Sequence, residues 1–527
     1  MKRRRFLDCL ALVMLAAALP SGVAGQAGSP PNIVLFLVDD MGWTDVGSYG
    51  SSFYETPSID ALAQEGVRFT NAYATCHVCS PSRASILTGK YPARLDLTDW
   101  LSGRKDFPFQ KLLNAEIHQS LPREEVTLAE TLKTHGYSTG IFGKWHLGEV
   151  PEGPETQGFD VKIPTDWNAC CPRSGYYAPY KMGGLDESEG DYLTDSLTDK
   201  ALDYIESNKD KPFFLYLSHF AVHDPIHGRP DLVEKYTEKL RDSDPPEGAP
   251  FVLEGNPDSE NSVSHDKLDA LIGEESYQGY RVFPNEAVKI KQHQDNVQFA
   301  GMVESTDASL GRVRAKLEEL GLTENTIIIF ASDNGGMSSA NFGNPNRVIQ
   351  PDDLDKAFST SNLPLRGAKG WLYEGGIRVP MIVKWPGQGA VGTISDVPVT
   401  GTDFYPTILE MAGLPLKPEQ HTDGVSLAPL VKGETALDRD AIYWHFPHYS
   451  NHGMQSPGGA IRSGDFKLLE YFENGTVQLF NLKDDIGETT DLAKSLPQTA
   501  NALRAKLHAW RDEVGANMMP PNPDYAP

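Results

Sequence analysis

Three short runs of the chain are almost entirely apolar and rich in β-branched or aromatic residues: Asn32–Val38, Phe213–Leu217 and Thr326–Phe330. Runs of this length without polar alternation are typical of strands buried on both faces of a sheet. A longer segment, from about Asp295 to Leu320, has the length and composition of a helix. Strands that alternate with helices predict an α/β fold with a parallel or mixed sheet flanked by helices.

Cap and turn residues place further elements. Thr56-Pro57 and Gly66 mark the start and end of a short helix. Two stretches are predicted to be insertions: Gly228 to about Asn285, which is polar, acidic and rich in Pro and Gly, and Met337 to Asn362, which is a long loop. We also expect strands at Val67–Ala74, Ser138–Phe142 and Met381–Lys384, and a helix at Val126–Lys133.

The pattern changes after about Arg439. Short strands are expected at Leu468–Tyr471 and Val477–Asn481, followed by an amphipathic helix at Pro497–Val514. We therefore predict two units after the N-terminal segment, a large α/β domain over residues 28–438 and a smaller α+β domain over residues 439–527.

The N-terminus has the pattern of a targeting segment. A basic cluster, residues 2–5, precedes an apolar run, residues 10–19, and a small-residue stretch, residues 21–27. The basic cluster also resembles a twin-arginine signal. We expect residues 1–27 to be a signal peptide and the protein to be exported, periplasmic or secreted. The apolar run is too short for a stable membrane span, and we expect no other span.

The net charge and the number of cysteines limit the kinds of binding partner and of cross-link that the protein can have. The formal net charge of −25 argues against general nucleic-acid binding. It also means that an anionic substrate would need a locally positive pocket or a metal. Beyond the N-terminal segment the cysteines are Cys76, Cys79, Cys170 and Cys171, too few for a disulfide framework. The state of the adjacent Cys170 and Cys171 stays open.

One stretch, residues 79–89, carries candidate chemistry. Ser80 is predicted to be a helix N-cap, Pro81 the first helical residue and Gly89 the stop. Cys79 would then lie just ahead of a helix N-terminus, where negative charge is favoured, and is a candidate nucleophile. The alternatives are a buried apolar cysteine, or a redox or zinc pair with Cys76.

Polar residues follow the predicted strands at their carboxyl ends. Asp39, Asp40, Asp333 and Asn334 offer hard oxygen ligands suited to calcium or magnesium. The cations Arg83, Lys144 and Lys369 suit sulfate or phosphate, and His146 and His223 suit proton transfer. Taken singly, each has a structural alternative: the acidic pair could be a solvated turn, Lys144 a surface lysine and His223 a loop histidine with its hydrogen bonds satisfied. His445 and His448 are further candidates from the second domain.

The motifs together identify a family resemblance. Cys79-Ser80-Pro81-Ser82-Arg83 followed by Leu87-Thr88-Gly89 resembles the signature of the type I, formylglycine-dependent sulfatases. Val38-Asp39-Asp40, Gly143-Lys144-Trp145-His146, Ser332-Asp333-Asn334-Gly335-Gly336 and Gly367-Ala368-Lys369-Gly370 resemble other blocks of that family, in family order. The C-terminal Leu479–Asp485 resembles bacterial carbohydrate sulfatases. The resemblance implies an alkaline-phosphatase-like mixed sheet flanked by helices.

The resemblance also implies site roles. It implies that a formylglycine-generating enzyme converts Cys79 to formylglycine, and that Asp39, Asp40, Asp333 and Asn334 bind one Ca2+ with the modified residue. Arg83 and Lys144 would stabilise the formylglycine, His146 would contact its hydroxyl, and Lys369 and His223 would face the sulfate and the leaving oxygen.

The expected activity is hydrolysis of a sulfate ester, of a sulfated carbohydrate or an aryl sulfate. Two alternatives stay open: a phosphonate monoester or phosphodiester hydrolase of the same fold, and a non-catalytic protein that binds sulfated glycans. The segment Pro164–Pro172 departs from the family pattern, so the pocket there is not predicted by the resemblance.

Overall fold

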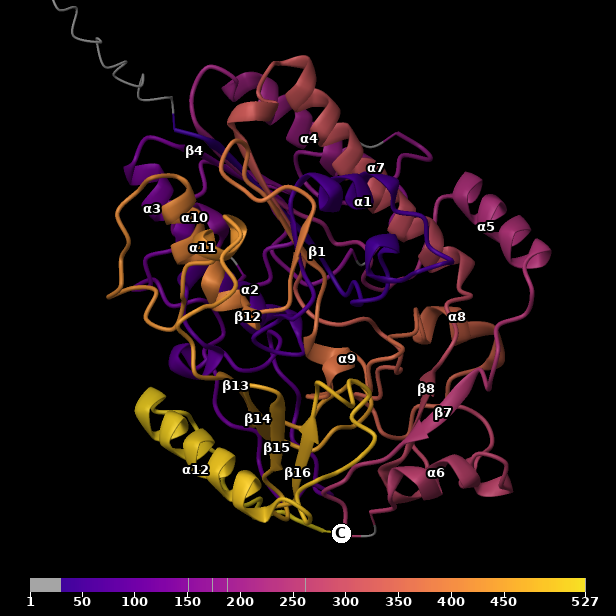
Figure 1. Ribbon diagram of the computed structural model, residues 1–527. Coiled ribbons are helices and arrows are strands. Elements are labelled where there is room, and N and C mark those ends of the chain that lie inside the picture. The colour runs from indigo at the N-terminus through magenta and orange to yellow at the C-terminus, as the bar shows by residue number, and fades with distance from the viewer. Residues whose placement is uncertain (1–29, 150, 173, 187, 261, 527) are drawn as a thin grey trace, which may run out of the picture.

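The computed structural model describes residues 30–149, 151–172, 174–186, 188–260 and 262–526 (Figure 1). The predicted signal peptide lies outside these residues. The centre of the larger lobe is an eight-stranded sheet. Its strands in spatial order are β11 (Thr393–Ser395), β2 (Val67–Phe69), β10 (Met381–Lys384), β9 (Thr326–Ser332), β1 (Asn32–Val38), β6 (Phe213–Ser218), β4 (Ser138–Gly143) and β5 (Val161–Ile163).

This sheet is mixed. Strand β1 pairs in parallel with β6 and β9, and β4 pairs in parallel with β6 and β5. Only β10 runs against both its neighbours, β9 and β2. The predicted α/β class with a mixed sheet is confirmed, and the three apolar runs of the sequence are its central strands.

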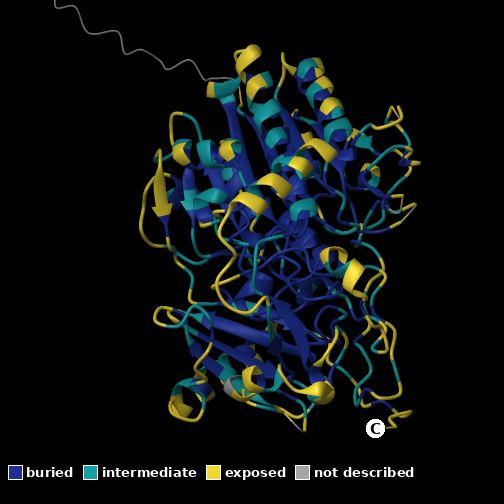
Figure 2. Ribbon diagram, turned by 90° about the vertical axis from the view of Figure 1, so that its right-hand side faces the viewer, coloured by how far each residue is buried: buried dark blue, intermediate teal, exposed yellow. Residues whose placement is uncertain are grey.

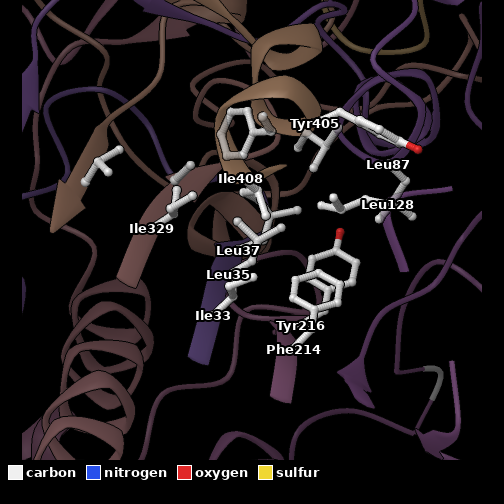
Figure 3. Close-up of a cluster of buried hydrophobic side chains, with 14 of the residues drawn as sticks. Ile33, Leu35, Leu37, Leu87, Leu128, Phe214, Tyr216, Ile329, Tyr405 and Ile408 are labelled. Carbon is white, nitrogen blue, oxygen red and sulfur yellow. The ribbon is translucent and has the colours of Figure 1, made fainter. Parts of the chain in front are cut away.

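Every residue of β1 is buried, because helices cover both faces of the sheet. Successive side chains of a strand point to opposite faces. Ile33, Leu35 and Leu37 therefore belong to one apolar cluster, and Val34, Phe36 and Val38 to another. Figure 3 shows the first cluster, where β1 side chains lie near Leu87, Leu128 and Ile408 of the covering helices.

Two layers of helices complete these clusters. The first face is covered by α2 (Cys79–Thr88), α3 (Leu128–Thr134), α10 (Phe404–Met411) and α11 (Ala428–Val431). The second is covered by α1 (Pro57–Glu65), α4 (Leu193–Asn208) and α7 (Val297–Glu319), and α5 (Pro230–Asp242) packs on α7. In Figure 2 the central strands are buried, and exposed residues gather on the outer helices and loops and on one strand at the margin.

The smaller lobe is a second, antiparallel sheet with one long helix beside it (Figure 1). Leu507, Trp510 and Val514 of the helix share an apolar cluster with Ile461 and Leu468 of the sheet. The boundary after residue 438 stays a prediction. The elements of this lobe are β13 (Ile442–Phe446), β14 (Gly458–Ser463), β15 (Phe466–Tyr471), β16 (Val477–Asn481) and α12 (Pro497–Val514).

One expectation was wrong. The single strand expected at Val67–Ala74 is two short strands, because the chain leaves the large sheet after β2 and pairs β3 (Ala72–Tyr73) with β12 (Val399–Thr400). The insertion expected from Gly228 contains regular elements: α5, β7 (Phe251–Glu254) and α6 (His265–Leu271), and β7 pairs with β8 (Val288–Lys291). Leu253, Leu268 and Phe283 give this insertion an apolar cluster of its own.

The remaining short helices are α8 (Leu354–Ala357), within the second expected loop, and α9 (Glu374–Ile377). Over the ranges that the structure describes, no helix is both long enough and apolar enough to cross a membrane.

Candidate active site at the carboxyl ends of the central strands

The polar residues after β1 are fixed by the loops that follow the neighbouring strands. Asp39 N–H donates to the Ala221 carbonyl after β6, at 3.0 Å. Asp40 takes a left-handed conformation, with φ of 61°, and its N–H donates to Asp333 Oδ1 after β9, at 3.2 Å. Both carboxylates are buried. The parallel pairing of β1, β6 and β9 thus brings three strand ends together.

Asp333 and Asn334 continue this cluster from β9. Asn334 Nδ2 donates to Asp40 Oδ1 at 2.8 Å. Asn334 Oδ1 has no hydrogen-bond partner among the described residues, although it is buried. The four predicted oxygen ligands, Asp39, Asp40, Asp333 and Asn334, therefore meet at one point of the sheet edge.

Cys79 is the first residue of α2, and Val78 is its N-cap. The predicted N-cap at Ser80 is therefore wrong by two positions. Ser80 Oγ instead accepts a hydrogen bond from Leu101 N–H at 3.1 Å. Pro81 is the third helical residue, where a missing N–H still costs no intrahelical bond. The predicted stop is confirmed, since Gly89 has φ of 72° and its N–H donates to the Ser85 carbonyl.

Strand β4 delivers Lys144 and His146. A Cβ on Gly143, which has φ of 111°, would lie 1.9 Å from the Ser218 carbonyl oxygen, so only glycine fits this close approach to β6. Lys144 Nζ contacts Asp39 Oδ2 at 2.5 Å.

His146 faces Cys79, with 3.2 Å between Nδ1 and Sγ. Its Nε2 lies 2.8 Å from the Leu101 carbonyl oxygen, which can only accept a hydrogen bond. Nε2 therefore carries the proton, and Nδ1 is the acceptor that faces position 79. Burial, with the charges of Lys144 and Arg83, places the pKa of His146 well below its usual value. A neutral imidazole in this orientation can take a proton from a group at position 79.

Arg83 lies one turn after Cys79 on α2 and is fully buried. Its Nε donates to Asp333 Oδ2 at 2.8 Å, and its Nη1 donates to Ser218 Oγ at 2.5 Å. Although burial acts in the opposite sense, Asp333 and Asp39 raise the pKa of Arg83 above its ordinary value. The contacts of its guanidinium orient Asp333, and the sequence alone did not indicate this.

His223 and Lys369 lie on the other side of the acidic cluster. Lys369 Nζ contacts Asp40 Oδ2 at 2.7 Å, and His223 Nε2 lies 3.6 Å from the same oxygen. His223 Nδ1 contacts Asp224 Oδ1 at 2.6 Å. Burial and Lys369 lower the pKa of His223, but the carboxylates of Asp40, Asp224 and Asp39 outweigh them and raise it to about 9. These carboxylates thus favour the protonated ring of His223, which can donate a proton.

The acidic cluster fits a hard divalent cation. Ligand atoms of Asp39, Cys79 and Asp333 all lie within 4.8 Å of one another. Burial and the neighbouring Asp333 raise the pKa of Asp39 to about 8, so a bare carboxylate there is destabilised and would gain from a cation. The unpartnered Asn334 Oδ1 adds a neutral oxygen. Carboxylate and amide oxygens are the ligands that calcium and magnesium prefer.

The structure adds residues that the motifs did not indicate. Asp224 directly follows His223 and orients its ring. Cys170 and Cys171 form a disulfide close to His223. His452, from the smaller lobe, lies against the loop of Lys369, since a Cβ on Gly370 would come within 2.5 Å of its Cβ.

The two C-terminal histidines named from the sequence make other contacts. His445 Nε2 bonds the Asn517 carbonyl at 2.8 Å, and His448 Nε2 bonds Thr98 Oγ1 at 2.8 Å. Both are buried, so these bonds account for them as parts of the packed interior.

Comparisons with known proteins agree with this arrangement. Residues 31–414 match the Sulfatase family, and residues 368–513 match the family described as N-sulphoglucosamine sulphohydrolase, C-terminal. A protein of Formosa agariphila named sulfatase is 31% identical, over 92% of this chain and 89% of its own length. Arylsulfatase A of Bos taurus is 30% identical, over 94% of this chain and 89% of its own. A crystal structure of Ps i-CgsB in complex with k-i-k-neocarrahexaose matches with a TM-score of 0.67 and 27% identity, over 92% of this chain and 93% of that one.

The chain therefore belongs to the sulfatase family and is a sulfuric ester hydrolase. The alkaline-phosphatase-like fold, with a mixed sheet flanked by helices and a smaller C-terminal unit, is confirmed.

Proposed function

We propose that this protein hydrolyses a sulfate ester of a carbohydrate, with a formylglycine made from Cys79 and one Ca2+ held by Asp39, Asp40, Asp333 and Asn334. One observation carries the proposal: Cys79 Sγ lies within 4.8 Å of carboxylate oxygens of Asp39 and Asp333, close enough for one ion to contact all three, and it also faces the acceptor nitrogen of His146. The similarity to a protein solved with k-i-k-neocarrahexaose supports a sugar as the substrate.

The charges within the proposed site favour an anionic substrate, although the net charge of the whole chain is negative. The buried carboxylates Asp39, Asp40 and Asp333 are balanced by Arg83, Lys144 and Lys369. Calcium would add two positive charges, so the loaded site would attract a sulfate ester. In a buried site with few mobile charges, this attraction is weakly screened.

Two histidines would carry out the two proton transfers of the reaction. An aldehyde at position 79 supplies, as its hydrate, one hydroxyl that attacks sulfur and a second whose deprotonation releases sulfate. His223 donates the proton at Nε2 to the leaving oxygen of the sugar. His146 accepts a proton at Nδ1 from the group at position 79. Lys144 and Lys369 stabilise the charge that develops on the sulfate oxygens, and bound calcium supplies further positive charge there.

The maturation partner and the location belong to the same proposal. An unmodified cysteine cannot supply two hydroxyls on one carbon, so the proposal requires that a formylglycine-generating enzyme, or an equivalent enzyme, acts on Cys79. The basic and apolar N-terminal pattern supports export to the periplasm or the medium.

The test combines mass and turnover. Protein from its own host should contain a Cys79 peptide lighter than the cysteine form by about 18 Da, or its hydrate. It should hydrolyse aryl and sugar sulfates in the presence of Ca2+, and turn over a matched phosphonate monoester more slowly. Cys79→Ala should be inactive, whereas Cys76→Ser should keep activity because burial raises the Cys76 thiol pKa and leaves it an inert packed group. An active protein with unmodified Cys79 would refute the formylglycine route. Faster phosphonate turnover would favour the phosphonate hydrolase alternative.

A further inference from the structure

The adjacent cysteines lie directly over one of the proposed site residues. Cys170 and Cys171 are joined by a disulfide in the segment after β5 that departs from the family pattern. Their Sγ atoms lie 3.8 Å and 3.9 Å from His223 Nε2. Both cysteines are partly exposed, so a small molecule in solvent can reach the sulfur atoms.

The same sulfur atoms extend toward the nucleophile. Cys170 Sγ, Cys79 Sγ and a His146 ring nitrogen all lie within 4.8 Å of one another. A second set of three donors, Cys170, Cys171 and His223, meets the same limit. Cys170 therefore lies near both proposed proton-transfer histidines, and Cys171 lies near His223.

We propose that Cys170, Cys171 and His223 form, when the disulfide is reduced, a binding site for a soft divalent cation such as Zn2+ or Cd2+. This site is separate in chemistry from the oxygen-rich cluster of Asp39, Asp40, Asp333 and Asn334. Thiolate and imidazole ligands select zinc-like ions, and carboxylates select calcium. Two sulfurs and one nitrogen supply three positions of a tetrahedral site.

The imidazole is already oriented for this role. Asp224 Oδ1 lies 2.6 Å from His223 Nδ1 and fixes the ring with Nε2 toward the two sulfurs. A carboxylate behind a histidine, which sets the tautomer and the ring orientation, is the arrangement found around protein-bound zinc. The disulfide form offers no thiolate, so it should not bind such an ion.

Occupancy therefore depends on a reductant of the dithiol class. One dithiol molecule transfers two electrons, the bond between Cys170 and Cys171 breaks, two S–H groups form, and the reductant becomes a cyclic disulfide. When the cation binds, the two thiol protons and the proton on His223 Nε2 leave to solvent, and two sulfur–metal bonds and one nitrogen–metal bond form. An ion on Nε2 would also remove the proposed proton donor, and only this consequence rests on the proposed function.

Cadmium is the probe, because thiolate-to-cadmium charge transfer absorbs in the ultraviolet. Intact protein is kept in Ca2+ buffer, either oxidised or reduced with dithiothreitol that is then removed by gel filtration. Reduced wild type should show the absorption at one Cd2+ per chain by native mass spectrometry, and the oxidised protein should show none. The double variant Cys170→Ser/Cys171→Ser should lose the absorption. His223→Asn should need more Cd2+ to reach it, and Cys76→Ser should retain it.

A measurement on wild type covers the case in which the double variant does not fold. In reduced wild type, Cd2+ should protect Cys170 and Cys171 from alkylation, as read by peptide mass. Absorption that persists in the folded double variant would overturn the proposal and assign the ion to Cys79 and His146. Absence of absorption and of protection in reduced wild type would also overturn it. Because these readouts do not use turnover, they separate failure of this site from failure of the proposed sulfatase chemistry.

Discussion

Replacement of His223 by asparagine tests the proposed proton donor directly. In the folded protein the ring is held between Asp40 Oδ2, 3.6 Å from Nε2, and Asp224 Oδ1, 2.6 Å from Nδ1. These carboxylates, with Asp39, raise the pKa of His223 to about 9 against the opposing effects of burial and Lys369. Asparagine can still donate a hydrogen bond, but it has no proton to transfer.

The size of the effect should depend on the leaving group. A general acid contributes about 10²–10⁴-fold in rate, which corresponds to about 2.7–5.5 kcal/mol of activation free energy. A sugar alkoxide is a poor leaving group, so turnover of a sugar sulfate by His223→Asn should fall by this full factor. A nitrophenolate is stable as an anion, so turnover of nitrophenyl sulfate should fall by less than about tenfold.

The assay compares kcat for the two substrates in wild type, His223→Asn and His227→Asn at neutral pH with Ca2+. His227 is a matched control, because it lies in the same segment and its ring packs near Gly175. The control should keep both activities. An equal loss on the two substrates would refute the assignment of His223 as the proton donor, and would leave it a role in holding Asp40.

Three further outcomes are expected. Lys467 is fully buried between Glu374 Oε1, at 3.0 Å, and Glu488 Oε1, at 2.9 Å. Lys467→Ala leaves the buried Glu488 carboxylate without this cation, and Glu374 keeps Arg378 as its ion-pair partner. The change should lower the free energy of unfolding in urea by about 3–5 kcal/mol, whereas exposed Lys483→Ala should change it by under about 0.5 kcal/mol. Equal effects of the two changes would contradict this. Burial raises the pKa of Asp45 to about 7. Between the ordinary pKa of an aspartate and this raised pKa, the folded protein holds a proton that the unfolded chain has already released. The free energy of unfolding of wild type, relative to that of Asp45→Asn, should therefore fall by roughly 3 kcal/mol between about pH 5 and about pH 8. A difference between the two proteins that does not change with pH would refute this prediction. Removal of calcium by a chelator should abolish turnover. Addition of Ca2+ at about 100 times its Kd should raise the free energy of unfolding by about 2.7 kcal/mol in wild type and by less in Asp333→Asn. Full turnover in protein verified as metal-free would exclude the calcium proposal.

The sequence by itself determined the class of fold and the residue types of the site. Short apolar runs that are rich in β-branched residues and lack polar alternation favour strands of a sheet covered on both faces, and β1, β6 and β9 are such strands. Because parallel strands share one edge for their carboxyl ends, Asp39 and Asp333 were expected to meet, and they do. The family motifs then indicated which neighbouring polar residues belong with them.

Only the tertiary structure decided the pairings that fix the chemistry. The Leu101 carbonyl sets the tautomer of His146, and Asp333 and Ser218 bind the Arg83 guanidinium. In each of these contacts the two residues are far apart in the sequence. The capping preference of serine predicted the start of α2 wrongly, because the Ser80 hydroxyl accepts a hydrogen bond from Leu101 N–H, in a distant loop, and not from an N–H of its own helix. The position of Cys170 and Cys171 over His223 likewise has no local signal. Local sequence patterns indicate which face of each segment is buried. Contacts between distant segments depend on how all these buried faces pack together in the complete fold.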